Sequence, residues 1–143
     1  MILFTIGFTK TSAECFFERL KDSGAQRILD VRLNNASQLS GFAKRDDLRY
    51  FADRLCNMTY RHMLELAPTK ELLDKYKKKK ISWDNYSEAF MDIIANRRIE
   101  ELDENDLDGS CLLCSEDKPH FCHRRLVAEY LQNNKRGIEI VHL

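Results

Sequence analysis

The sequence lacks any apolar run that approaches the roughly 20 residues needed to cross a lipid bilayer. Its first residues, Met1-Ile2-Leu3-Phe4, also lack the basic flank and the cleavage region of a secretory signal peptide. Both absences argue against a membrane protein or a secreted one. We therefore expect a cytoplasmic protein that has no membrane partner.

An excess of charge of either sign is missing too, because 23 lysines and arginines are balanced by 23 aspartates and glutamates. The chain has no global field that would attract nucleic acid, although a local basic patch could still do so. Low-complexity tracts and internal repeats are absent, and 43% apolar and 32% charged residues are typical of a globular protein. The five cysteines form an odd number, and without a secretion signal we expect reduced thiols.

The pattern of apolar residues predicts strands that alternate with helices. The expected strands cover residues 3–7, 27–32, 58–63, 111–114 and 138–143. The helices are expected to begin at Thr11, near Asp46, at Thr69, at Ser82 and at Cys122. This alternation produces right-handed crossovers and parallel sheets. We therefore predict one α/β domain over residues 1–143, three-layered and Rossmann-like, with a mostly parallel sheet of about five strands and helices on both faces.

In a parallel sheet the carboxyl ends of the strands share one edge, and ligands bind there. That edge should bring together Thr5-Ile6-Gly7, Asp30-Val31-Arg32 and Cys114-Ser115-Glu116, which are far apart in the chain. Asp30 and Arg32 alternate around Val31, so their side chains lie on one face and close enough to pair. The pair would either orient the following loop or hold a ligand.

Residues 110–125 contain the densest group of reactive side chains. A strand that ends at Cys114 is followed by an acidic loop and then by a helix that opens with Cys122-His123-Arg124-Arg125. The first N–H groups of that helix are unpaired and its dipole makes this end positive, so the arginines need a negative partner. A bound phosphate or carboxylate would supply one, and so would Glu116 or Asp117 folded over the helix end. The alternative is a surface helix whose arginines extend into solvent.

Two cysteines in this segment are candidate nucleophiles. Cys122 opens the helix, where the dipole and the nearby cations would lower the pKa of its thiol. Cys114 lies at the end of the strand, and Glu116 and His123 could transfer protons beside it. A free cysteine in a strand is also commonly a small buried apolar residue, and this is the alternative for Cys114.

The spacing Cys111-x-x-Cys114 followed by Cys122-His123 also matches part of a zinc-binding pattern. Residues i and i+3 of a strand point to opposite faces, so both thiols reach one ion only if the strand ends between them. We therefore expect no metal and no cofactor. Cys111, together with Cys15 and Cys56 on helix faces, is expected to be buried as an apolar residue.

Motifs spread along nearly the whole chain are shared with a known family. They are Thr5-Ile6-Gly7, Asp30-Val31-Arg32, Ser37, Gly41-Phe42, Tyr60, Leu66, Leu113-Cys114-x-Glu116 and Cys122-His123-Arg124. Together they resemble the family called domain of unknown function number 488, and the last two motifs are the most specific. The resemblance implies a compact α/β domain. It also implies a site formed by Gly7, Asp30, Arg32, Cys114, Glu116, Cys122, His123 and Arg124.

The chain departs from the family pattern in two places. Phe8 and Thr9 stand where many members have histidine and serine, and Asn34 and Asn35 stand where many have proline shortly after Asp-Val-Arg. Either a histidine at position 8 is dispensable for the activity of this protein, or the chain belongs to a subgroup with a different activity.

These observations predict an enzyme that acts on an anionic, phosphate-bearing small molecule or nucleotide, and a cysteine-dependent hydrolase or transferase is our hypothesis. The expected catalytic residues are Cys114, Glu116, Cys122 and His123, and the expected substrate-binding residues are Gly7, Asp30, Arg32, Arg124 and Arg125. The competing hypothesis is a non-catalytic module that binds nucleic acid or a nucleotide through the lysine run 77–80 and the arginines. A metal-stabilised domain is a third alternative.

Overall fold

The computed structural model describes residues 1–36 and 40–143, and its centre is a five-stranded parallel sheet. The strands are β1 (Ile2–Gly7), β2 (Arg27–Asp30), β3 (Thr59–His62), β4 (Ser110–Cys114) and β5 (Glu139–His142), in the order β3-β2-β4-β1-β5. Each strand lies where the apolar pattern predicted one, although β2 ends at Asp30 rather than at position 32. The predicted single α/β fold with a parallel sheet is thus confirmed.

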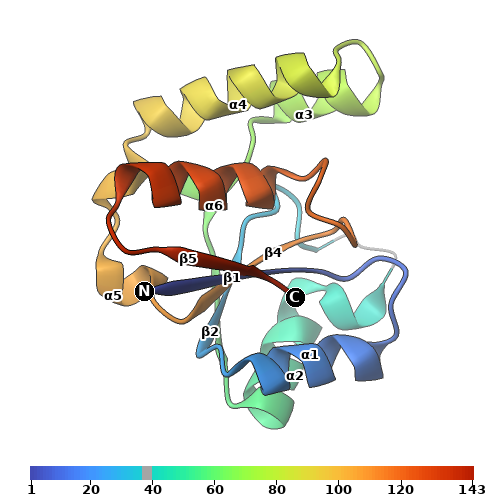
Figure 1. The fold of residues 1–143 in the computed structure, drawn as a ribbon. Helices are drawn as coiled ribbons and strands as arrows, with labels where there is room; N and C mark the ends of the chain where they lie inside the picture. Colours follow the sequence, from blue (N-terminus) through green and yellow to red (C-terminus); the bar gives the residue numbers. More distant parts are fainter. Residues whose placement is uncertain (37–39) are drawn as a thin grey trace.

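Helices cover both faces of this sheet (Figure 1). On one face lie α1 (Ala13–Ser23) and α2 (Arg45–Cys56), and on the other lie α3 (Lys70–Lys77), α4 (Trp83–Asn96) and α6 (His123–Asn134). Short elements complete the described chain: α5 (Glu104–Leu107), η1 (Gly41–Ala43), η2 (Leu64–Leu66) and η3 (Ile99–Glu101). Helix α6 packs on β1, β4 and β5, and α4 packs along α6.

Side-chain caps explain where several of the helices begin. The Thr69 hydroxyl accepts the N–H of Leu72, and the Ser82 hydroxyl accepts the N–H of Asn85, so the starts predicted for α3 and α4 are confirmed. For α1 the predicted cap at Thr11 is wrong by one residue, because Ser12 accepts the N–H of Cys15. Each cap satisfies one of the helix N–H groups that have no partner within the helix.

Strand β4 lies between β2 and β1, and all five of its residues are buried. Its side chains alternate between two apolar clusters: Cys111 and Leu113 pack with α1 and α2, whereas Leu112 and Cys114 pack with α3, α4 and α6. The expectation that Cys111 is a buried core residue is confirmed. The same expectation is wrong for Cys15, which is exposed on α1.

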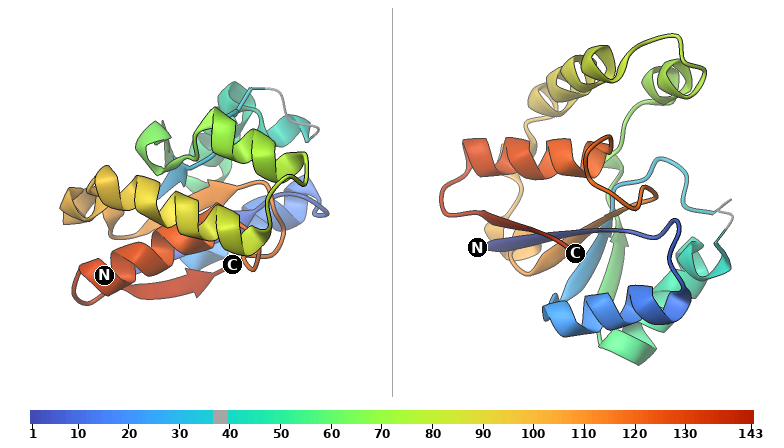
Figure 2. Two further views of the ribbon diagram at one scale, coloured as in Figure 1. Left: turned by 90° about the horizontal axis from the view of Figure 1, so that it is seen from above. Right: turned by 45° about the vertical axis from the view of Figure 1, so that its right-hand side comes forward.

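The strand ends that were predicted to converge do so. Gly7 on β1 is the register partner of Cys114 on β4, and Asp30 on β2 is the partner of Leu113. The loops that leave these three strands lie at the same end of the sheet, as both views in Figure 2 show. Within the described residues, no helix combines the length and the apolar character that a membrane span requires.

Candidate functional site

A pocket of about 260 Å³ opens at this end of the sheet. Segments that are far apart in sequence build it, namely the residues after β2, the helices α3 and α4, and the connection between β4 and α6. Cys114, Glu116, Cys122 and His123, the expected catalytic residues, all line the pocket. Of the expected substrate-binding residues, Arg32 lines it, whereas Gly7, Asp30, Arg124 and Arg125 lie outside.

A cluster of two thiols and an imidazole lines the pocket. Cys114 is the last residue of β4, Cys122 is the N-cap of α6, and His123 is the first residue of that helix. The ligand atoms of the three side chains all lie within 4.8 Å of one another. Residue 122 has an extended backbone (φ −133°, ψ 135°), and the helix begins directly after it at His123.

The backbone fixes the tautomer of His123. Its Nε2 lies 2.6 Å from the carbonyl oxygen of Val31. Cys114 Sγ lies 3.7 Å from Nδ1 and 3.9 Å from Nε2 of the same ring. A carbonyl oxygen only accepts hydrogen bonds, so Nε2 carries a proton, and in the neutral ring the lone pair is therefore on Nδ1. That lone pair can take a proton from Cys114, which is the relation between a thiol nucleophile and its base.

The two thiols differ in their acidity. The pKa of Cys114 is lowered, first because it accepts a hydrogen bond from Cys122 and then through Ser115 and the positive charge of Arg124, although burial opposes the shift. The pKa of Cys122 is raised well above its ordinary value, because burial penalises its thiolate and because it is the donor in that bond. The expectation that the helix start lowers the pKa of Cys122 is therefore wrong. Desolvation outweighs the helix dipole at this position.

Arg124 is almost completely buried, with 1% of its surface exposed. Its Nη1 donates to the carbonyl oxygen of Glu116 at 2.5 Å, its Nη2 to that of Asp117 at 3.4 Å, and its Nε to the Thr5 hydroxyl at 3.4 Å. The acidic loop does fold over the helix end, as one alternative proposed, but backbone carbonyls rather than carboxylates meet the arginine. Arg124 therefore positions the loop beside the pocket.

Arg125 and Gly7 are also outside the pocket, for different reasons. Arg125 pairs along its own helix with Glu129 at 3.4 Å. Gly7 passes under the backbone of Glu116 and so provides space for the loop. Neither residue is placed to contact a ligand in the pocket.

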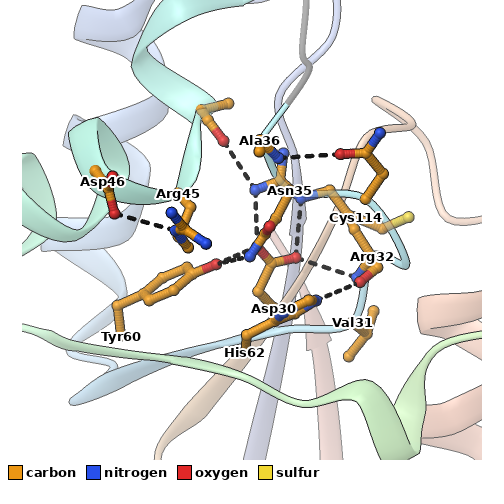
Figure 3. Close-up of polar contacts among 12 residues, drawn as sticks. Asp30, Val31, Arg32, Asn35, Ala36, Arg45, Asp46, Tyr60, His62 and Cys114 are labelled. Atoms are coloured by element: carbon orange, nitrogen blue, oxygen red, sulfur yellow. Dashed lines mark hydrogen bonds and ion pairs between the residues drawn. The ribbon is translucent and has the colours of Figure 1, made fainter.

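Asp30 and Arg32 form the buried ion pair that their spacing predicted (Figure 3). Asp30 Oδ1 accepts from Arg32 Nε at 2.9 Å, and Oδ2 accepts from Arg32 Nη2 at 2.7 Å and from the Tyr60 hydroxyl at 2.5 Å. Nη2 also donates to the carbonyl oxygen of Ala43. Arg32 Nη1 is buried as well, but it has no hydrogen-bond partner among the described residues. A buried guanidinium donor without a partner is costly, and because Arg32 lines the pocket, an anion that reached Nη1 from there would satisfy it.

Aromatic side chains form another wall of the pocket. Trp83 stacks on Tyr86 with ring centroids 5.3 Å apart and meets Phe121 edge to face at 5.7 Å. Tyr86 is buried in the core, whereas Trp83 is only partly buried and Phe121 has 64% of its surface exposed. The sequence reasoning did not identify Phe121. The sequence feature that could have identified Phe121 is a large aromatic residue at the end of the polar loop that precedes Cys122.

The same cluster defines which residues could hold a metal ion. Cys114, Cys122 and His123 are a group of potential ligands, and His123 already donates its other ring N–H to a carbonyl, as metal-bound histidines do. Cys111 is not part of the group, because it points to the opposite face of the sheet. Charges of both signs surround this group. Arg32 lines the same pocket but is paired with Asp30, and Glu116 lines the pocket as well, while the charge of Arg124 acts on Cys114.

Comparisons with family models, curated proteins and solved structures show what the protein is related to. A family model described as domain of unknown function DUF488 matches residues 12–131, which include every residue that lines the pocket. No curated protein and no solved structure matches the chain.

Proposed function

The chain belongs to the DUF488 family, and from that premise we propose that it is an enzyme acting on a phosphate-bearing small molecule or nucleotide by covalent catalysis at Cys114. The observation that carries this proposal is the arrangement around one pocket. A thiol with a lowered pKa, a histidine nitrogen 3.7 Å from it and a buried arginine with an unpaired donor all adjoin the same space. These are the parts that a cysteine-dependent hydrolase or transferase uses on an anionic substrate.

The chemistry follows from the roles that these groups suit. His123 Nδ1 takes the proton of Cys114, the thiolate bonds to the electrophilic centre of the substrate, and the leaving group departs with the proton from His123. Water or a second substrate then takes up the group from Cys114. Glu116, which is exposed and lines the pocket, suits proton transfer in that second step. Cys122 remains protonated and stabilises the thiolate by donating a hydrogen bond to it.

Substrate binding in this proposal depends on charge at one part of the pocket and on aromatic surface at another. Arg32 Nη1 would hold a phosphate oxygen, and Lys77 adds a second cation to the lining. Trp83 and Phe121 offer the faces and edges of their rings to a planar group such as a nucleobase. The proposed compartment is the reducing cytoplasm, because Cys114 acts only as a free thiol.

A thermal-shift screen of nucleotides and phosphorylated metabolites tests the proposal. A ligand present at about 100 times its Kd stabilises the protein by about 2.7 kcal/mol, which is a readily measured rise in Tm. Arg32→Lys keeps a positive charge near Asp30 but removes the forked donor, so it should weaken ligand binding by at least about tenfold. Lys80→Gln, which changes an exposed residue outside the pocket, is the matched control and should leave the affinity unchanged.

The second candidate function is a non-catalytic module that binds nucleic acid or a nucleotide, and the exposed lysines at 77–80 favour it. This function predicts a different result for the control substitution. Lys80→Gln would then weaken binding of single-stranded DNA or RNA as much as Arg32→Lys does. The affinity would also fall steeply with salt, because each phosphate contact releases counterions. Such a result would replace the enzyme proposal.

A further inference from the structure

We propose that Cys114 and Cys122 are a redox pair that a hydroperoxide converts into a disulfide, and that this bond reversibly blocks the pocket. The modification itself needs only the two thiols and the oxidant. Its consequence, loss of activity, rests on the function proposed above.

The geometry of the two residues carries this inference. Both cysteines are free, both line the pocket, and their sulfur atoms lie within 4.8 Å of each other. Cys122 stands at the N-cap, where the chain is extended, so its side chain is not constrained by a preceding helical turn. The connection between the two cysteines contains exposed residues at 116, 118, 120 and 121. Small changes in side-chain rotamers and in this loop would therefore bring the sulfur atoms to bonding distance.

The surroundings make Cys114 the thiol that reacts first. Its sulfur lies 3.7 Å from His123 Nδ1, a base that can take its proton, and within 4.8 Å of the Cys122 sulfur that would complete the disulfide. Cys15 is more exposed than Cys114, yet it lies on α1, outside this pocket. Reactivity toward peroxide follows thiolate character as well as exposure, so the pocket cysteine should be oxidised ahead of the surface one.

The disulfide forms in two steps. The Cys114 thiolate attacks one oxygen of the hydroperoxide, an S–O bond forms as the O–O bond breaks, and the leaving hydroxide or alkoxide takes up a proton. Cys114 is thereby oxidised by two electrons to the sulfenic acid. The Cys122 sulfur then attacks the Cys114 sulfur, an S–S bond forms as the S–O bond breaks, and water leaves with the proton of Cys122. A thiol or dithiol reductant reverses the change by disulfide exchange.

The disulfide would inactivate the site in two ways. It removes the Cys114 thiolate, and it ties the start of α6 to the end of β4 across the pocket. His123 follows Cys122 directly, so its ring would also be displaced from the position that faces Cys114.

Mass spectrometry of the peroxide-treated protein tests this inference. The reduced full-length protein should lose two hydrogen atoms in mass on treatment with hydrogen peroxide and regain them with dithiothreitol. Trypsin leaves both cysteines in one peptide because Pro119 follows Lys118, whereas cleavage after Glu116 separates them. The expected product is a pair of peptides, one containing Cys114 and the other Cys122, that a disulfide joins.

Three variants make the test specific. Cys122→Ser should stop the reaction at a Cys114 sulfenic acid that dimedone traps, and Cys114→Ser should leave Cys122 unmodified. Cys15→Ser is the control and should form the disulfide at the wild-type rate. In the wild type, Cys114 should be consumed at least about tenfold faster than Cys15.

Two outcomes would overturn the inference. One is oxidation of Cys15 while Cys114 and Cys122 stay reduced. The other is a stoichiometric metal ion in the purified protein that protects both cysteines until a chelator removes it. The ligand screen on the reduced protein is a separate measurement, so a disulfide without any anionic ligand would refute only the proposed function. A ligand that binds to a protein that forms no disulfide would refute only the redox pair.

Discussion

Gly7 and Glu116 meet through their backbones alone: an ideal Cβ on Gly7 would stand 1.6 Å from the carbonyl oxygen of Glu116. The same oxygen accepts the hydrogen bond from Arg124 Nη1. The N–H groups of Phe8 and Thr9 donate to the carbonyl oxygen of Ser115 next to it. The end of β1 thus supports the loop that follows β4, and the absence of a side chain at position 7 is what lets the loop lie there.

Gly7→Ala should destabilise the protein by at least about 3 kcal/mol, because the new methyl group meets backbone atoms that have no rotamer by which to move away. The matched control is Gly41→Ala, where an added Cβ has nothing within 4 Å, and its effect should stay within about 0.5 kcal/mol. Urea unfolding of both variants measures the difference. Equal stabilities for the two variants would show that the loop does not rest on Gly7.

Asp30→Asn should cost about 3–5 kcal/mol of folding free energy, because it leaves the buried Arg32 guanidinium without its counter-charge. Tyr60→Phe removes a single donor to the same carboxylate and should cost less, about 1.5–3 kcal/mol. Chemical denaturation monitored by circular dichroism gives both values. If Tyr60→Phe were the more damaging variant, the ion pair would not be the centre of this network.

The alkylation rate of Cys114 should reach its plateau at a lower pH than that of Cys122, because the pKa of the first thiol is lowered and that of the second is raised. Cys122→Ala removes the hydrogen-bond donor, so the pKa of Cys114 should rise and its alkylation at pH 7 should slow. Cys122→Ser retains a donor and should leave the rate close to that of the wild type. Peptide mass spectrometry after timed exposure to iodoacetamide measures each rate. Identical pH profiles of Cys114 alkylation in the Ala and Ser variants would contradict the role of Cys122 as the hydrogen-bond donor that lowers the pKa of Cys114.

Phe121→Ala should weaken the binding of a nucleotide by about 1–3 kcal/mol through loss of stacking, and should leave inorganic phosphate binding unchanged. Its effect on stability should stay within about 0.5 kcal/mol because the ring is 64% exposed. Tyr50→Ala is the control, since Tyr50 is 57% exposed and lies on α2, outside the pocket. Isothermal titration calorimetry with a nucleotide and with inorganic phosphate measures the two affinities. Equal losses of affinity for nucleotide and phosphate would exclude a stacking role.

Local features of the sequence predicted the strands and helices well, because each strand or helix depends mainly on residues that are close together in the chain. The apolar runs predicted the strands, and the hydroxyls of Thr69 and Ser82 predicted two helix starts. The alternation along β4 predicted that Cys111 and Cys114 face opposite sides of the sheet, and they do. The spacing of Asp30 and Arg32 predicted their pairing for the same reason.

The contacts and the acidity of individual side chains were predicted less well. The helix dipole argument predicted a negative partner for the arginines at the start of α6. Arg125 has one in Glu129, but two backbone carbonyls and the Thr5 hydroxyl meet Arg124 instead. The same argument predicted an acidic Cys122, whereas burial raises its pKa. Both errors come from the position of a loop relative to the helix, and no periodicity encodes that position.

By itself the sequence determined the order of strands and helices, the parallel sheet and the end of that sheet at which reactive residues gather. These follow from apolar periodicity and from the handedness of the crossovers, which are properties of short segments. Only the tertiary structure decided which thiol is the more acidic, which arginine faces the pocket and which aromatic rings line it. Those outcomes depend on burial and on contacts between residues such as Val31 and His123, which lie far apart in the chain and meet only in the folded protein.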